Sequence, residues 1–216
     1  MPTVLLTGFE PFDGEKVNPA WEAVAALAAE RPAGVEIATA QLPCVFDGSI
    51  EALRAAIVEH RPELVVAVGQ AGGRAVVTPE LVAVNVRDAR IPDNSGAQPV
   101  DVPVVDGGPA AYLSTLPVKA CVAAIRAAGV PAALSHTAGT FVCNHIFYGL
   151  MHLLATEFPG VRGGFTHVPY LPEQVAALGL DRPSMALRTI TDGLAALVGT
   201  ALATTEDLAV TGGALH

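Results

Sequence analysis

The sequence has little positive charge. Its 216 residues include 12 Lys and Arg against 21 Asp and Glu, a formal net charge of −9, and charged residues of both signs make up only 15%. An acidic surface repels phosphate backbones, so we do not expect a nucleic acid partner. The Lys and Arg residues are scattered, without the basic run that is typical of a membrane-surface patch.

Long hydrophobic runs and paired cysteines are also missing. No stretch approaches the roughly 18 apolar residues of a membrane-spanning helix, and the first residues, MPTVLLTGFEPFDGE, lack the positive segment of a signal peptide. The three cysteines are widely spaced and form no CxxC pair, which disfavours a disulfide scaffold and a zinc site. These features predict a cytoplasmic protein with reduced thiols and no membrane anchor.

Hydrophobic residues, 51% of the chain, are abundant enough for the core of one large domain. Short apolar runs predict strands at residues 3–7, 35–41, 64–68, 81–86, 132–136 and 163–168. Longer periodic patterns predict helices at residues 19–30, 47–60, 117–128, 144–156 and 184–203. This alternation predicts an α/β fold, a single three-layer α/β/α domain with a mostly parallel mixed sheet over residues 1–204. Residues 205–216 lack a clear period and predict a loosely ordered C-terminal tail.

Two connections have the composition and place of functional loops. Residues 69–73, with the sequence GQAGG, follow a predicted strand at its carboxyl end, where open α/β sheets bind ligands. Residues 87–116 are rich in Pro, Gly, Asp and Asn, and a connection of that length in a compact domain is usually functional.

One cysteine stands where a nucleophile would be placed. Cys143 lies at or just before the first turn of a predicted helix. Free backbone N–H groups and the helix dipole at that place are expected to lower the pKa of the thiol. Cys121 shares a helical apolar stripe, and Cys44 follows Pro43 at a strand end. Both fit structural roles in a core.

A thiolate nucleophile needs an imidazole base, and the imidazole needs an acceptor that orients it. His136 and His167 each end a predicted strand, and the residue pattern leaves both open as the base. Glu80 stands between two apolar stretches and is a candidate acceptor, although an ordinary surface carboxylate fits the same pattern.

Four longer motifs occur in order along the chain. They cover residues 6–14 with Asn18-Pro19, residues 69–74 with 78–80, residues 137–144, and residues 167–174. Together they resemble the signatures of pyroglutamyl peptidase type I, also called pyrrolidone-carboxylate peptidase, and the similarity runs from about residue 3 to residue 190. Several long motifs in register are more specific than a single short one.

The resemblance implies a cysteine peptidase that removes an N-terminal pyroglutamyl residue through a thioester acyl-enzyme. It assigns Cys143 as nucleophile, His167 as base and Glu80 as the orienting acid, and it implies a cytoplasmic homotetramer without metal or cofactor. It implies a pyroglutamyl pocket lined by Phe9, Phe12, Gln70, Ile91, Phe141 and Val142. Arg90 matches an arginine near the acyl site, where it either adds charge or pairs with a carboxylate such as Glu10.

Two other functions fit parts of the sequence. A glutaminase-like amidase also uses Cys, His and Glu, but the tight Gly-x-Cys-x-Gly elbow of such enzymes is absent around Cys143. A nucleotide binder could use residues 69–73 as an anion loop, but neither a P-loop Lys nor a Rossmann glycine triplet accompanies them. The departures from the resembled family are an Ala-rich first helix, Cys44 and an extended tail, and none of them touches the motifs of the triad.

Overall fold

A central sheet organises the computed structural model, which describes residues 1–213. Within these residues its strands are β1 (Thr3–Phe9), β2 (Glu36–Leu42), β3 (Leu64–Gln70), β4 (Thr78–Pro79) and β7 (Arg162–Val168), in the order β2-β1-β3-β7-β4. Each neighbouring pair among β2, β1, β3 and β7 is parallel, and the short β4 is antiparallel to β7. The predicted mixed and mostly parallel sheet is confirmed.

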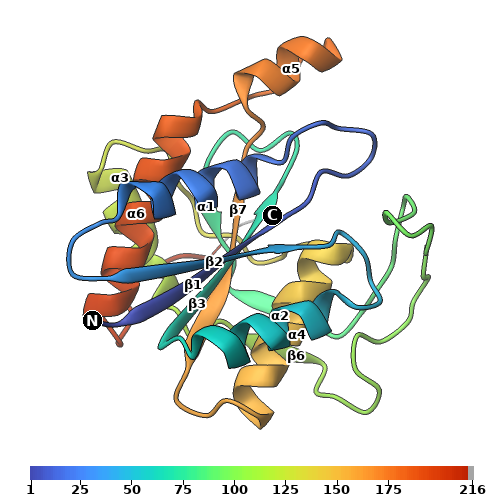
Figure 1. Ribbon diagram of the computed structural model, residues 1–216, viewed down its shortest axis with the longest axis horizontal. Helices are drawn as coiled ribbons and strands as arrows, with labels where there is room; N and C mark the ends of the chain where they lie inside the picture. The colour runs from blue at the N-terminus through green and yellow to red at the C-terminus, as the bar shows by residue number, and fades with distance from the viewer. Residues whose placement is uncertain (214–216) are drawn as a thin grey trace.

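Helices cover both faces of this sheet (Figure 1). The helices α1 (Pro19–Glu30), α3 (Val118–Ala127) and α6 (Leu187–Ala203) pack on one face, and α2 (Ser49–His60) and α4 (Val142–Thr156) on the other. Alternate residues of one strand serve the two cores, since Val4 and Leu6 face α1 while Leu5 faces the opposite layer. β3 is apolar on both faces for the same reason.

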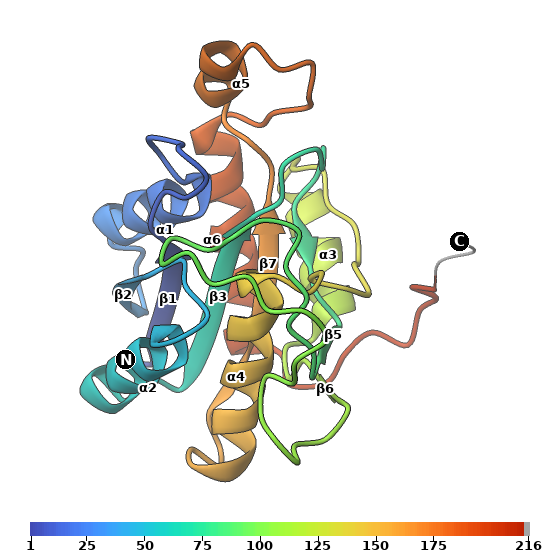
Figure 2. The same ribbon diagram turned by 90° about the vertical axis from the view of Figure 1, so that its right-hand side faces the viewer.

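The long connection after β4 holds a small hairpin. Its strands β5 (Val82–Val84) and β6 (Ala111–Leu113) pair with each other outside the main sheet and lie beside α4 (Figure 2). The irregular chain between them is fixed by its own polar groups. The Asp93 carboxylate accepts from the backbone N–H of Phe46 at 2.7 Å and of Ala97 at 2.9 Å.

The sequence prediction placed one strand wrongly and missed others. Residues 132–136 form no regular strand. They make isolated bridges to the outer edge of β4, where Ser135 N donates to Pro79 O at 3.0 Å and Leu81 N donates to Ser135 O at 2.8 Å. β4, β6 and the short helix α5 (Pro172–Leu178) were not predicted. Each is too short to have a period that the sequence could display.

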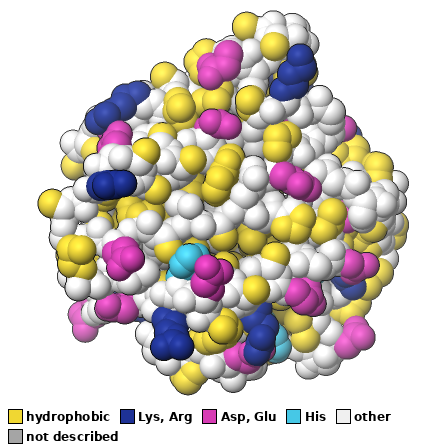
Figure 3. Space-filling view, viewed as in Figure 1, with side chains coloured by type: hydrophobic (Ala, Val, Ile, Leu, Met, Phe, Trp, Pro, Cys, Tyr) yellow, Lys and Arg dark blue, Asp and Glu magenta, His cyan; other side chains and the backbone are white. Residues whose placement is uncertain are grey.

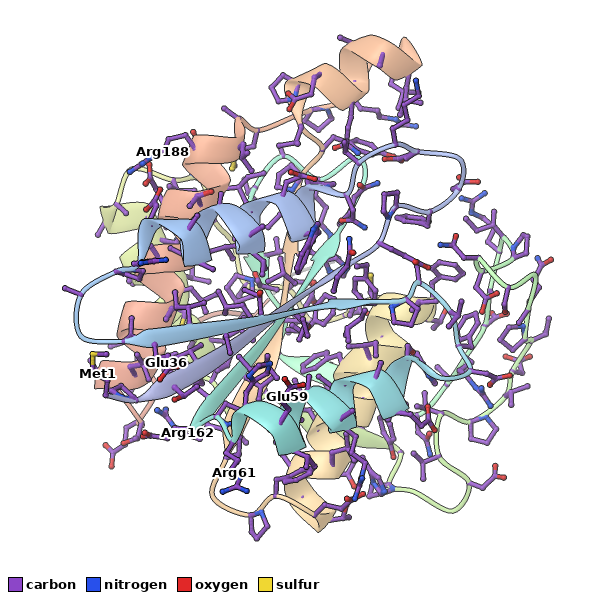
Figure 4. The ribbon with its side chains drawn as sticks, in the orientation of Figure 1. Met1, Glu36, Glu59, Arg61, Arg162 and Arg188 are labelled. Carbon is purple, nitrogen blue, oxygen red and sulfur yellow. The ribbon has the colours of Figure 1, made fainter. Side chains whose placement is uncertain are left out.

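Arginines tie the C-terminal helix to the rest of the domain. Arg162 donates to the carbonyl oxygens of Ala201 and Thr204 at the end of α6, at 2.6 and 3.1 Å. Arg188 pairs with Glu30 of α1 at 3.0 Å, and both arginines are labelled in Figure 4. The helix ends of α6 and α1 are thereby joined, although an exposed pair such as Arg188–Glu30 contributes little stability.

The predicted tail is described only as far as residue 213. Residues 205–213 form no helix or strand, and Asp207 accepts from the backbone N–H of Lys119 and Ala120 at the start of α3, at 3.1 and 2.9 Å. Residues 214–216 of that prediction lie outside the described residues.

The surface agrees with the low positive charge of the sequence. On the face shown in Figure 3, Lys and Arg side chains are spread among acidic ones. Within residues 1–213, no helix combines the length and the apolar composition needed to cross a membrane.

Candidate active site

The candidate residues come from the carboxyl ends of two adjacent strands and the start of one helix. β3 ends with Gly69 and Gln70, and Gly69 pairs in register with His167 at the end of β7. α4 begins at Val142, so Cys143 is its second residue. Parallel strands bring their carboxyl ends to one edge of the sheet, which is where ligands bind in open α/β folds.

The sulfur of Cys143 lies directly over Gly69. A methyl group built on Gly69 would be only 2.9 Å from Sγ and 2.6 Å from Cζ of Phe165. Partners in a parallel register point their side chains to the same face of the sheet, so Cys143 and His167 share the face that α4 covers. Cys143 remains partly exposed, as a candidate nucleophile must be.

His167 and Glu80 form a buried pair. Nδ1 of His167 and Oε1 of Glu80 are 2.7 Å apart, and both side chains are almost fully removed from solvent. Glu80 follows β4 directly, and its backbone N–H donates to Phe165 O at 2.9 Å. The short antiparallel strand therefore fixes the carboxylate beside the imidazole, and the edge of the Phe165 ring, 4.9 Å away between centroids, packs on the imidazole.

Arg74 is a polar partner that the sequence argument missed. Its Nη1 donates to the same Oε1 of Glu80 at 2.6 Å, and its Nη2 donates to Thr137 O at 3.0 Å. Arg74 lies within the second of the four motifs, but no role was predicted for it. The available signal was a cation six residues before a candidate buried carboxylate.

Burial governs the protonation of the thiol and the imidazole. Burial raises the pKa of Cys143 to about 12; the charge of Glu80 adds to this and that of Arg74 opposes it. Burial also lowers the pKa of His167, and the hydrogen bond and charge of Glu80 oppose that shift. The site without substrate therefore holds a neutral thiol and a neutral imidazole at neutral pH. The expected lowering of the thiol pKa was wrong, because burial outweighs the helix start.

The other candidate base lies elsewhere. His136 lines a cavity beside α3 together with Lys119 and Leu208, on the opposite side of the sheet from α4. His145, two residues after Cys143, is buried with its ring 5.5 Å from that of Phe46. Neither histidine is placed as His167 is, next to Gly69 and hydrogen-bonded to a buried carboxylate.

Aromatic rings form one wall beside the thiol. Phe141, the residue before α4, packs against Phe12 at 6.2 Å and Phe46 at 5.4 Å between ring centroids. Phe12 and Phe141 are partly exposed, whereas Phe9 and Val142 are buried. Phe46 was not among the predicted pocket residues, because nothing in the sequence near it marks a site.

The polar residues predicted for the pocket have other partners. The side chain of Gln70 donates to Glu15 and accepts from Gln174, both at 3.1 Å, so it ties the loop after β1 to α5. Arg90 is exposed and Ile91 partly exposed. Glu10, the carboxylate suggested as a partner of Arg90, accepts through Oε1 from Cys44 N and Asn94 Nδ2, and the role of Arg90 stays a prediction.

The segment with Arg90 and Ile91 nevertheless borders residues 137–141, the loop that leads to Cys143. Asp88 N donates to Thr140 O at 3.0 Å, and Thr140 Oγ1 donates to Asp88 O at 2.7 Å. Asn144 completes the attachment, because its side chain accepts from Val84 N and donates to Val84 O. The start of α4 is thus held in place by the long connection.

A comparison with protein families shows the family to which the chain belongs. The model of the family described as pyroglutamyl peptidase matches residues 2–204. The chain belongs to the pyroglutamyl peptidase family. Membership makes it a peptidase, and therefore a hydrolase, and the resemblance seen in the four motifs is confirmed.

Relatives of this peptidase family match over the whole chain. The pyrrolidone-carboxylate peptidase of Streptomyces coelicolor is 60% identical over 218 residues, which cover 100% of both chains. Among solved structures, pyroglutamyl peptidase I of Bacillus amyloliquefaciens has a TM-score of 0.94 at 50% identity, with 97% of this chain and 99% of that chain covered. A mutant pyrrolidone carboxyl peptidase of Pyrococcus furiosus has a TM-score of 0.88 at 38% identity, with coverages of 93% and 98%.

Within residues 1–213, no group of three or more His, Cys, Asp and Glu side chains is arranged to hold a metal ion.

Proposed function

We propose that this peptidase hydrolyses the bond after an N-terminal pyroglutamyl residue of peptides, with Cys143 as nucleophile, His167 as base and Glu80 orienting the base. The observation that carries the proposal is the 2.7 Å hydrogen bond between His167 Nδ1 and Glu80 Oε1, next to a partly exposed thiol at a helix start. Nucleophile, base and acceptor in this order are the arrangement of a covalent hydrolase.

Attack and proton transfer occur together in this mechanism. Because the resting thiol and imidazole are both neutral, Sγ gives its proton to Nε2 of His167 as it bonds to the pyroglutamyl carbonyl carbon. Glu80 stabilises the imidazolium that forms. His167 then returns the proton to the leaving amine, which departs and leaves a thioester. Water, deprotonated by His167, hydrolyses the thioester and regenerates the thiol.

The start of α4 supplies the donors for the oxyanion. The first N–H groups of a helix have no intrahelical partner, and the backbone N–H of Cys143 is the donor nearest the reacting sulfur. Donors of this kind act on the negative oxygen of the transition state more strongly than on the resting carbonyl.

The aromatic wall suits a small neutral lactam. Phe12 and Phe141 offer flat apolar surface, with Phe46 behind Phe141. The Gln70 side chain is already hydrogen-bonded to Glu15 and Gln174. Backbone groups around Gln70 are therefore left to bind the lactam amide. Ile91, Val142 and Phe9 complete the apolar lining, and Arg90 stands at the acyl side.

We also propose a cytoplasmic homotetramer. The three cysteines, all in the described part, are free thiols. α5 projects from the body of the molecule (Figures 1 and 2), and the chain at its end exposes Leu178 and Leu180. Apolar side chains on a projecting segment are typical of contacts between subunits. Light scattering on purified protein tests the assembly, and a monomer mass would contradict it.

Substrate choice tests the proposed activity most directly. Prolyl amides match the shape of pyroglutamyl amides but carry a cationic amine and lack the lactam carbonyl. A charge against the phenylalanines without a carboxylate partner costs several kcal/mol, and a stranded pocket donor costs about 1–3 kcal/mol more. We expect kcat/KM to fall by about three orders of magnitude or more, at about 1.4 kcal/mol for each factor of ten.

The measurement compares fluorogenic pyroglutamyl, prolyl and glutaminyl amides with one leaving group. Cys143→Ala should abolish turnover, and Cys121→Ala, a core thiol behind α6, is the matched control that should retain it. Prolyl turnover within tenfold of pyroglutamyl turnover would contradict a neutral lactam pocket.

A further inference from the structure

We propose that Arg74 is a positioning residue of the active site, whose single guanidinium holds both the Glu80–His167 pair and the loop that leads to Cys143. The inference rests on the proposed function only for the reaction in which it is measured. Arg74 itself has no place at the reacting atoms, and it acts through Glu80 and through the loop.

The first half of the guanidinium engages the buried carboxylate. Nη1 of Arg74 donates to Oε1 of Glu80 at 2.6 Å and to Oγ1 of Thr78 at 2.6 Å. Oε1 is the same oxygen that accepts from His167 Nδ1, while Oε2 of Glu80 is buried without a partner among the described residues. The orientation of the base therefore depends on an oxygen that the arginine shares.

The second half of the guanidinium engages the nucleophile loop. Nη2 of Arg74 donates to Thr137 O at 3.0 Å, and Ser135 Oγ donates to the same carbonyl at 3.2 Å. Thr137 opens the segment 137–141 that enters α4 just before Cys143. A planar fork fixes the distance between its two acceptors, so Arg74 sets the spacing between Glu80 and the loop. A lysine at this position supplies the charge but not the fork.

The positive charge of Arg74 also affects the protonation of His167 and Cys143. The Glu80 side chain is 0% exposed and that of Arg74 is 30% exposed. Without its cation, Glu80 is a fully buried carboxylate that has lost its ion-pair partner, which is a strongly destabilising arrangement. The charge of Arg74 also adds to the lowering of the pKa of His167 that burial causes, and it opposes the raising of the pKa of Cys143.

Removing the positive charge of Arg74 shifts the pKa values of His167 and Cys143 in the same direction, upward. Among the described residues, the charged groups that act on His167 and Cys143 are Glu80 and Arg74, and Cys143 in turn acts on the buried thiol of Cys44. Loss of Arg74 should raise the pKa values of His167 and Cys143. The pH dependence of kcat/KM and that of the alkylation of Cys143 should both shift to higher pH.

The experiment compares Arg74→Met and Arg74→Lys with wild type across the pH range. The matched control is Arg54→Met. Arg54 lies on α2, away from the site, and forms an exposed ion pair with Glu157. One readout is kcat/KM for a fluorogenic pyroglutamyl amide. The other is the rate at which iodoacetamide alkylates Cys143, followed by mass spectrometry of the labelled peptide.

We expect Arg74→Met to lower kcat/KM at pH 7 by about tenfold or more and to move the acid limb upward by about one pH unit. The alkylation midpoint should move in the same direction. Arg74→Lys should keep the limb near its wild-type position and still lose rate, because the contact to Thr137 is lost. Arg54→Met should match wild type in both readouts.

A merely structural role would leave both pH profiles of Arg74→Met at their wild-type positions, whatever its rate or stability, and that result overturns the proposal. If Arg74→Met does not fold, Arg74→Gln should show the same upward shift of both pH profiles. If neither neutral variant folds, the proposal requires Arg74→Lys to keep the wild-type profile at a reduced rate. If wild type itself does not cleave pyroglutamyl amides, the proposed function fails, while the alkylation profile still decides the role of Arg74.

Discussion

Gly69→Ala should separate the requirements of the chemistry from those of the fold. The new Cβ would lie 2.6 Å from Cζ of Phe165 and 2.9 Å from Sγ of Cys143. Ordinary carbon contacts begin near 3.5 Å, so the sulfur and the ring must each retreat by roughly 0.5–1 Å. Both neighbours are parts of the site, since Phe165 supports the imidazole of His167 from 4.9 Å.

The magnitude follows from these contacts. One extra methyl in a packed region costs typically 1–3 kcal/mol of unfolding free energy. Misplacing a nucleophile by about 1 Å can cost about a hundredfold in rate. We therefore expect kcat/KM per folded molecule to fall by about two orders of magnitude while the protein stays folded at 25 °C.

Two other glycines provide matched controls. A methyl on Gly164 would clash with Ser114 Oγ and lie 2.8 Å from Leu116 Cδ1, on the opposite face of the sheet, and a methyl on Gly199 in α6 meets nothing within 4 Å. Gly164→Ala should lose stability comparably and keep its kcat/KM. Gly199→Ala should be neutral or gain up to about 1 kcal/mol.

The assay combines urea unfolding with kcat/KM normalised to folded protein. Wild-type kcat/KM in Gly69→Ala would refute the placement of the sulfur over Gly69. Equal kinetic losses in Gly69→Ala and Gly164→Ala would show that overpacking anywhere in the sheet accounts for the effect.

The remaining predictions concern histidines and the orienting acid. His167→Ala should lose turnover almost as completely as Cys143→Ala, whereas His136→Ala should keep it, and the opposite ranking in a pyroglutamyl amide assay would exchange their roles. Glu80→Gln should fold and lose part of kcat, because an amide accepts the hydrogen bond without stabilising an imidazolium; wild-type kcat would remove Glu80 from the mechanism. Burial lowers the pKa of His145 from 6.5 to about 4, so the unfolded chain binds this proton first. Stability should fall as pH drops below 6.5, by about 2 kcal/mol at pH 5. His145→Phe should remove that share of the pH dependence in urea unfolding, and an unchanged pH slope would contradict the burial of a neutral ring.

Much of the fold could be predicted because the apolar pattern of its strands has a direct physical cause. Residues 64–68 are apolar without alternation, and β3 is indeed covered by helices on both faces. The start of α1 was equally readable, since Asn18 accepts from Ala20 N and Pro19 takes the first helical position. Such local signals do not depend on what packs nearby.

The parts that could not be predicted depend on packing between distant segments. Arg74 reaches Thr137 across the sheet edge, and Phe46 reaches Phe141 from the loop after β2. The thiol pKa was misjudged for the same reason. The helix start is visible in the sequence near Cys143, but the burial that outweighs it depends on segments distant in the sequence, such as the end of β3, where Gly69 lies beneath the sulfur.

The order of the strands explains why the residue pattern could not choose between His136 and His167. Both histidines follow extended apolar segments, so each resembles the other locally. Residues 132–136 pair with the outer edge of β4, which places His136 beyond β7 and beside α3. β7 instead inserts between β3 and β4, so His167 has Gly69 on one side and Thr78 on the other. Because β7 lies between β3 and β4, His167 is next to Gly69, over which the thiol of Cys143 lies, and next to β4, which Glu80 follows. The placement of His167 beside Gly69 and Glu80 is therefore a property of the sheet order, which no short segment of the sequence contains.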